Sequence, residues 1–247
     1  CKLIIHTERI LYMKHFSFKL PSISASVSCM DLMNLQAQIS ECEKAGISFF
    51  HYDVVDGKFN RCFILGDSLL ESLSASTNLP TEVHLAVYEP EIYIERFAKL
   101  GADYIAVQYE TLSDPFAIFD LIRKYGSEPV LCYKAETPPG PDFLSLAKEV
   151  AWILKLTVNP GFSGQQIQTQ AIKHIHSMRF CLSEADLSTP IQADGNVTSS
   201  TLPLLASAGA NIFTGGSSGL FIKNSCLKKN VSKLLYLANK NTNGNVY

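Results

Sequence analysis

A histidine and an aspartate stand two residues apart where an apolar run ends. The run covers 47–50, and His51 and Asp53 follow it. Side chains alternate along a strand, so these two share one face. An imidazole and a carboxylate placed in this way can bind a metal ion, and the carboxylate can exchange a proton with a molecule held there. A core histidine hydrogen-bonded to an aspartate would give the same pattern, so the pair alone decides nothing.

Two further predicted strands end in groups of the same kind. His84 lies near the end of the run 82–86, and Asp194 ends the run 191–194. Alone, His84 fits a satisfied core histidine, and Asp194 fits a turn or a helix cap. Together with the first pair they make two imidazoles and two carboxylates, a ligand set suited to zinc or ferrous iron. Because burying two unpaired carboxylates is costly, the combination favours a metal site over packing.

Glycine-rich segments follow the last three predicted strands. They cover 159–165, 195–196 and 215–219. Glycines let backbone N–H groups approach an anion closely, although each segment alone would also suit an ordinary turn. Three such segments at adjacent strand ends favour a bound phosphate.

Composition limits the classes of protein that this chain can represent. It has 247 residues, of which 47% are hydrophobic and 18% charged, and its formal net charge is −2. No basic field attracts nucleic acid or an anionic membrane. Seven cysteines without C-x-x-C pairs give no disulfide framework, and we expect a cytoplasmic protein. No run is apolar enough to span a membrane, and the first 20 residues lack the pattern of a secretory signal.

The elements that position these groups alternate along the chain. Strands are predicted near 22–27, 48–54, 82–87, 103–109, 129–134, 152–158, 190–194 and 211–215. Helices are predicted near 30–45, 67–76, 90–100, 114–125, 141–149, 166–184, 198–208 and 223–239. Eight such units predict an α/β fold, a single-domain (β/α)₈ TIM barrel, with a doubly wound open sheet as the alternative. We expect an extension over 1–20, the barrel over 21–240 and a tail over 241–247, with disorder after Ala238.

Over residues 22–240 the sequence resembles the ribulose-phosphate 3-epimerase family. The resemblance rests on ordered motifs: His51-x-Asp53-x-x-Asp56-Gly57, Val83-His84-Leu85, Thr157-Val158-Asn159-Pro160-Gly161-Phe162-x-Gly164-Gln165, Asp194-Gly195 and Gly216-Ser217. Segments 26–32 and 216–221 look closer to the allulose-6-phosphate 3-epimerase branch.

The resemblance implies roles for particular residues. His51, Asp53, His84 and Asp194 would bind one divalent metal ion, zinc or iron(II) before manganese or cobalt. Asp53 and Asp194 would be the two catalytic acid/base residues. Ser26 matches a substrate-contacting serine. The phosphate loops match Gly161, Phe162, Ser163, Gly164, Gly195, Asn196, Gly216 and Ser217. The family also implies a homo-oligomer.

Several positions depart from the family pattern. Gln108 stands where the family commonly has histidine, and it cannot change charge near neutral pH. We expect it to point into the barrel, either to hydrogen-bond substrate or a ligand carboxylate, or as a neutral polar filler. The other departures alter the substrate envelope and spare the acid/base groups: 59–62, Ala86, Lys134-Ala135 and Leu156.

The predicted site residues and the family resemblance together predict a metal-dependent epimerase that inverts C3 of a ketose phosphate. Ribulose 5-phosphate would become xylulose 5-phosphate through an enediolate, with one aspartate on each face of the carbon. Two alternatives stay open: an allulose-6-phosphate 3-epimerase, and a non-catalytic barrel that only binds a sugar phosphate. No nucleic acid or membrane partner is expected.

Overall fold

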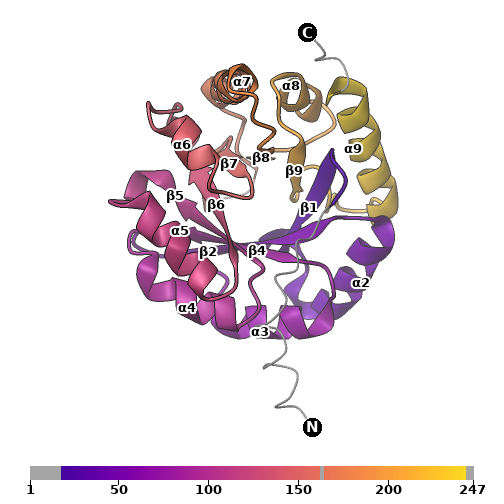
Figure 1. The fold of residues 1–247 in the computed structure, drawn as a ribbon. Helices are drawn as coiled ribbons and strands as arrows, with labels where there is room; N and C mark the ends of the chain where they lie inside the picture. The colour runs from indigo at the N-terminus through magenta and orange to yellow at the C-terminus, as the bar shows by residue number, and fades with distance from the viewer. Residues whose placement is uncertain (1–17, 162–163, 243–247) are drawn as a thin grey trace.

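Parallel strands close into a barrel with the helices around it (Figure 1). The computed structural model describes residues 18–161 and 164–242. Within them, eight parallel strands form the barrel, because β1 pairs with both β2 and β9. The strands are β1 (Ser22–Ser26), β2 (Phe49–Asp56), β4 (Thr81–Ala86), β5 (Tyr104–Gln108), β6 (Glu128–Tyr133), β7 (Ile153–Leu156), β8 (Ile191–Asp194) and β9 (Ile212–Gly215). The predicted TIM barrel is thus confirmed over the open sheet.

Helices follow the strands and cover the outside of the barrel. They are α2 (Leu35–Ala45), α3 (Asp67–Ser76), α4 (Glu91–Lys99), α5 (Pro115–Lys124), α6 (Phe143–Ala147), α7 (Thr169–Glu184), α8 (Leu202–Ser207) and α9 (Leu227–Thr242). Short 3₁₀ turns occupy Val27–Cys29, Leu32–Asn34 and Tyr109–Thr111. No helix of the described residues is long and apolar enough to cross a membrane.

Three details differ from the sequence prediction. The helix expected from residue 30 begins at Leu35, because Asp31 instead accepts a hydrogen bond from the Met33 amide and starts a 3₁₀ turn. The short strand β3 (Phe63–Ile64) was not expected, and it pairs antiparallel with the end of β2. Helix α9 continues to Thr242, so the disorder expected after Ala238 is wrong for residues 239–242. Residues 1–17 and 243–247 lie outside the described residues.

Two apolar clusters support the barrel. The larger fills the layer between strands and helices and includes Phe50 and Tyr52 from β2. The smaller lies inside the barrel, where Phe49, Tyr104 and Trp152 pack together near the amino ends of their strands. The alternation predicted for β2 is therefore confirmed, since His51 and Asp53 face the interior.

Strand register brings the polar side chains of the interior to matching heights. Asp53 on β2 pairs with His84 on β4, and His51 pairs with Glu82. On the far side, Leu156 on β7 pairs with Asp194 on β8. Neighbouring parallel strands thus place Asp53, His84 and Asp194 toward the carboxyl ends of the barrel strands, where TIM barrels carry their active sites.

Candidate active site

Two imidazoles meet one carboxylate at the carboxyl end of β2 and β4. Nε2 of His51 lies 3.0 Å from Oδ1 of Asp53, and Nδ1 of His84 lies 3.1 Å from the same oxygen. One ligand atom from each of these three residues lies within 4.8 Å of the others, as a cation site requires. The sequence predicted all three, and the fold brings them together.

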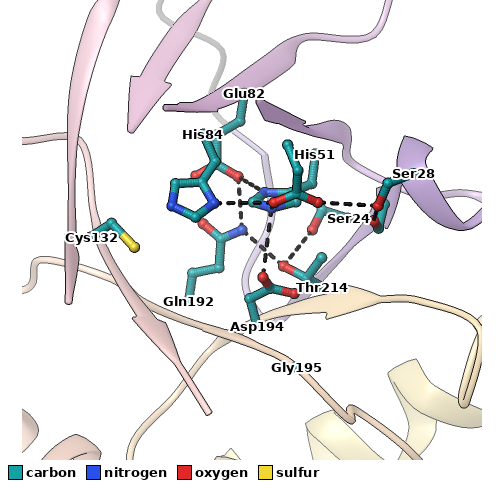
Figure 2. A network of polar contacts seen from close by, with 12 residues as sticks. Ser24, Ser28, His51, Glu82, His84, Cys132, Gln192, Asp194, Gly195 and Thr214 are labelled. Atoms are coloured by element: carbon teal, nitrogen blue, oxygen red, sulfur yellow. Dashed lines mark hydrogen bonds and ion pairs between the residues drawn. The ribbon is translucent and has the colours of Figure 1, made fainter. Parts of the chain in front are cut away.

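Asp194 approaches the same imidazole from β8. Its Oδ2 lies 3.7 Å from Nε2 of His51, and Figure 2 shows its carboxylate directed at that ring. Asp194 is not one of the three residues, His51, Asp53 and His84, whose ligand atoms all lie within 4.8 Å of one another. The His51 side chain is fully buried, whereas those of Asp53 and Asp194 are 19% and 21% exposed. The two carboxylates therefore remain accessible to a small molecule, while the imidazole lies beneath them.

A buried glutamate below the site fixes the orientation of His51. Oε2 of Glu82 accepts a 2.6 Å hydrogen bond from Nδ1 of His51 (Figure 2). Nε2 of the same ring therefore points to Asp53 and Asp194. Glu82 also accepts hydrogen bonds from Nε1 of Trp152 and Nε2 of Gln192. Three donors compensate its buried charge. The sequence analysis gave Glu82 no role, although its place two residues before His84 puts both on one strand face.

The pKa values of the two carboxyl groups shift in opposite directions. Burial opposes ionisation of Asp53, but His51 and His84 outweigh it and hold its pKa well below the ordinary value. Burial, helped by the charge of Asp53, raises the pKa of Asp194 to about 6. Burial also disfavours the charged form of His51, but its carboxylate neighbours hold its pKa well above the usual range. A bound cation would lower the proton affinity of all these groups.

One serine contacts the outer oxygen of Asp53, and a second serine contacts the first. Oγ of Ser28 donates to Oδ2 of Asp53 at 3.2 Å, and Oγ of Ser26 lies 2.9 Å from Oγ of Ser28. Oδ1 of Asp53 thus faces the histidines and Oδ2 faces the serines. The sequence analysis gave Ser28 no role, because a loop sequence does not show which residue its serine contacts.

A cavity of about 610 Å³ opens above these groups, a size typical of small-ligand sites. It is lined by most of the residues predicted to touch the metal, sugar or phosphate: Ser26, Asp53, His84, Gly161, Gly164, Asp194, Gly195, Asn196, Gly216 and Ser217. Phe162 and Ser163 lie outside the described residues. Gln108 is fully buried and lies beside His84, not on the cavity wall.

Close contacts at two glycines bring together the segments that follow β7, β8 and β9 at one side of the cavity. Gly195 has a φ of +109°, and a Cβ there would lie 2.5 Å from Cγ2 of Val158. A Cβ on Gly219 would lie 2.0 Å from the carbonyl oxygen of Val197. Glycine at 195 therefore lets the loop after β8 lie against the segment after β7, and glycine at 219 lets the loop after β9 lie against the loop after β8. In this fold these loops commonly form the phosphate site.

The loop after β2 contacts one of the cavity's glycine loops. Nδ2 of Asn60 donates to the carbonyl oxygen of Pro160, and a Cβ on Gly161 would lie 2.7 Å from Sγ of Cys62. The loop after β2 thus contacts the glycine loop after β7. Nζ of Lys134 lies 4.5 Å from the centre of the Phe59 ring, which joins two segments that depart from the family pattern.

The donor set fits a divalent cation. Two imidazole nitrogens and two carboxylates suit zinc or ferrous iron, and all four belong to interior strand positions. The hydrogen bond from Nδ1 of His51 to Glu82 leaves Nε2 as the ligand atom, which is the usual arrangement of a metal-binding histidine.

Comparison with known proteins finds relatives over most of the chain. A sequence profile described as the Ribulose-phosphate 3 epimerase family matches residues 22–221. The ribulose-phosphate 3-epimerase of Methanocaldococcus jannaschii is 32% identical over 195 residues, which cover 79% of this chain and 82% of that protein. The Bacillus subtilis protein of the same name is 32% identical over 79% of this chain and 90% of its own length.

Solved structures share the fold at lower identity. The 3-hexulose-6-phosphate synthase of Salmonella typhimurium has a TM-score of 0.63 and 12% identity, covering 89% of this chain and 99% of that one. Orotidine 5′-phosphate decarboxylase of Pyrococcus horikoshii has a TM-score of 0.60 and 12% identity, covering 88% and 99%. At these identities the likeness concerns the fold alone.

Proposed function

The chain belongs to the ribulose-phosphate 3-epimerase family, and from this premise we propose a metal-dependent enzyme that inverts C3 of a ketose phosphate. The proposed reaction converts ribulose 5-phosphate into xylulose 5-phosphate. One observation carries the proposal: Asp53 and Asp194 approach one imidazole nitrogen at 3.0 and 3.7 Å, and both line a cavity that also holds the glycine loops.

Inversion needs one group to remove the C3 proton and another to return a proton to the opposite face. We assign Asp53 to one face and Asp194 to the other, with their acid and base roles exchanged in the reverse direction. The intermediate is an enediolate of the sugar. Ser28 would orient the outer oxygen of Asp53 through the 3.2 Å hydrogen bond.

We assign the metal ligands to His51, Asp53, His84 and Asp194. When bound there, a divalent cation supplies charge stabilisation worth several kcal/mol for the developing oxyanion. Zinc and iron(II) suit this nitrogen and oxygen donor set before manganese or cobalt.

We assign the sugar and phosphate contacts to the remaining cavity residues. The backbone N–H groups of Gly195, Asn196, Gly216 and Ser217 would bind the phosphate. Gly161 and Gly164 would contact it from the loop after β7, and Ser26 would contact the sugar.

Allulose 6-phosphate is the second candidate substrate. Leu156, one of the departures from the family, lines the cavity, and the departing loop at 59–62 contacts the cavity loop at 160–161. Both changes bear on the space available to the sugar.

The purified protein should be assayed on both sugar phosphates after chelation and after metal is restored, with deuterium incorporation at C3 as the readout.

Deuterium incorporation at C3 that is lost on chelation and regained with metal supports the epimerase. The faster substrate decides between pentose and hexose. Phosphate-ester binding without any isotope exchange would instead support the non-catalytic barrel.

We also propose a homo-oligomer in a reducing compartment. The described cysteines are all free, which suits a reducing environment. Light scattering on the purified protein tests the oligomeric state directly.

A further inference from the structure

Thr157 lies buried behind the loop that follows β8. It comes directly after β7, its side chain is fully buried, and it is not among the residues that line the cavity. Its N–H donates to the carbonyl oxygen of Asp194 at 2.7 Å, and its Oγ1 donates to the carbonyl oxygen of Gly195. A Cβ on Gly195 would lie 3.0 Å from the same hydroxyl oxygen. Thr157 therefore fixes the backbone that joins a proposed catalytic aspartate to a proposed phosphate loop.

The hydroxyl of Thr157 determines which way the next peptide faces. A peptide unit is planar, and in the trans form its C=O and N–H groups point in opposite directions. The peptide between Gly195 and Asn196 is trans. Because its carbonyl points at the buried Thr157, the N–H of Asn196 points away from Thr157. Both Gly195 and Asn196 line the cavity, so this N–H is available to a ligand there.

A second threonine holds the carbonyl that follows. Thr201, at the start of α8, donates from Oγ1 to the carbonyl oxygen of Asn196. Asn196 has a φ of +46°, and Gly195 before it has a φ of +109°. Two consecutive carbonyls are thus held by threonine hydroxyls, and the N–H groups of Asn196 and Val197 are directed away from them. Backbone N–H groups arranged in such a turn can bind an anion.

We propose that Thr157 is a positioning residue for phosphate binding, because its hydroxyl turns the N–H of Asn196 toward the phosphate of the substrate. The inference rests on the proposed phosphate site at the loop after β8. It gives Thr157 no contact with the substrate and no part in proton transfer. Thr157→Val keeps the shape of the side chain, removes the donor and places a methyl group against the carbonyl oxygen of Gly195.

Inorganic phosphate is the probe for binding. Its dissociation constant is measured by calorimetry for the wild type, Thr157→Val and Thr157→Ser, which keeps the hydroxyl. Thr189→Val is the matched control, because it also removes a threonine hydroxyl that donates to a backbone carbonyl oxygen, that of Ala147. KM and kcat for ribulose 5-phosphate are measured on the same proteins. Amide NMR of the wild type follows the N–H of Asn196 as phosphate is added.

The inference predicts a change in binding that leaves turnover intact. Thr157→Val should bind phosphate about tenfold more weakly and raise KM by about the same factor, the effect of a misdirected hydrogen bond to a charged group. Its kcat should stay within about threefold of the wild type, as should every constant of Thr157→Ser and Thr189→Val. The Asn196 amide proton of the wild type should move downfield when phosphate binds.

Three results would overturn the inference. They are an unchanged phosphate affinity in Thr157→Val, a fall in its kcat at constant KM, which would assign Thr157 to Asp194 instead, and an Asn196 amide that does not respond to phosphate. The last result is decisive even if Thr157→Val does not fold. A wild type that binds phosphate without isotope exchange at C3 would overturn the proposed reaction alone, and the phosphate affinities would then decide the role of Thr157.

Discussion

Glu82 and His51 are joined by a 2.6 Å hydrogen bond between two fully buried side chains. The bond places the proton of His51 on Nδ1 and turns Nε2 to the aspartates. Glu82 lies on β4 inside the barrel, and its partners come from β2 (His51), from the residue before β7 (Trp152) and from β8 (Gln192). The orientation of a proposed metal ligand is therefore set by residues that never touch the cavity.

Glu82→Gln should weaken metal binding about 10- to 100-fold, because an amide is a weaker acceptor for His51 and its NH₂ group opposes the donors of Trp152 and Gln192. Elemental analysis after equilibrium dialysis against the metal gives the measurement. Glu128→Gln is the matched control, since Glu128 is the first residue of β6 and is only partly buried. Equal metal affinity in Glu82→Gln and the wild type would exclude this role.

Asp53→Asn and Asp194→Asn should each lower turnover by at least about 10²-fold while the fold survives, because each removes one positioned acid/base. Isotope exchange at C3 and circular dichroism are the measurements. Asp120→Asn is the control, since Asp120 is 80% exposed on α5. Near-normal epimerisation in both directions by either variant would show that the two-base assignment is wrong.

Much of the metal cluster could be predicted from the sequence, because the decisive information is local. Strand alternation places His51 and Asp53 on the same face of one strand. The repeating βα pattern places His84 and Asp194 at the same end of the barrel. The roles of these residues in binding and catalysis stay predictions.

The partners of Glu82 could not be predicted in the same way. Trp152 and Gln192 lie 70 and 110 residues away in the chain, and only the closure of the barrel brings them to Glu82. The contact between Gln108 and His84 likewise depends on the register of β4 against β5. The start of α2 was misplaced because Asp31 could equally cap a helix or a 3₁₀ turn.

His84→Ala should lose bound metal and activity together, because removing one ligand leaves the carboxylates poorly compensated. Metal content of the purified proteins is compared with that of His176→Ala, a change at an exposed position on α7. Equal metal content in His84→Ala and the wild type would refute His84 as a ligand.

Gly195→Ala should raise KM for the sugar phosphate about tenfold or more, since a hydrogen bond to a charged group is worth roughly 1.5–3 kcal/mol. The new Cβ would lie 2.5 Å from Val158 and displace the loop. Gly126→Ala is a matched control, because its φ is also positive, at +84°, and its Cβ would meet nothing within 4 Å. An unchanged KM in Gly195→Ala would remove this loop from the phosphate site.

Lys155 on β7 should make the free energy of unfolding depend on pH above neutrality. Its side chain is fully buried, and Nζ donates to the carbonyl oxygens of Lys134 and Thr137. Burial lowers its pKa from 10.5 to about 8. Between these two values the unfolded chain binds more protons than the native protein, so stability rises with pH, by up to about 3 kcal/mol from this residue. Below pH 8 both states are protonated, and its contribution stays constant.

Urea unfolding of the wild type and Lys155→Met from pH 7 to 10 measures the effect, because other titrating groups cancel in the difference. A difference that is flat across this range would mean that Lys155 keeps an ordinary pKa in the folded protein.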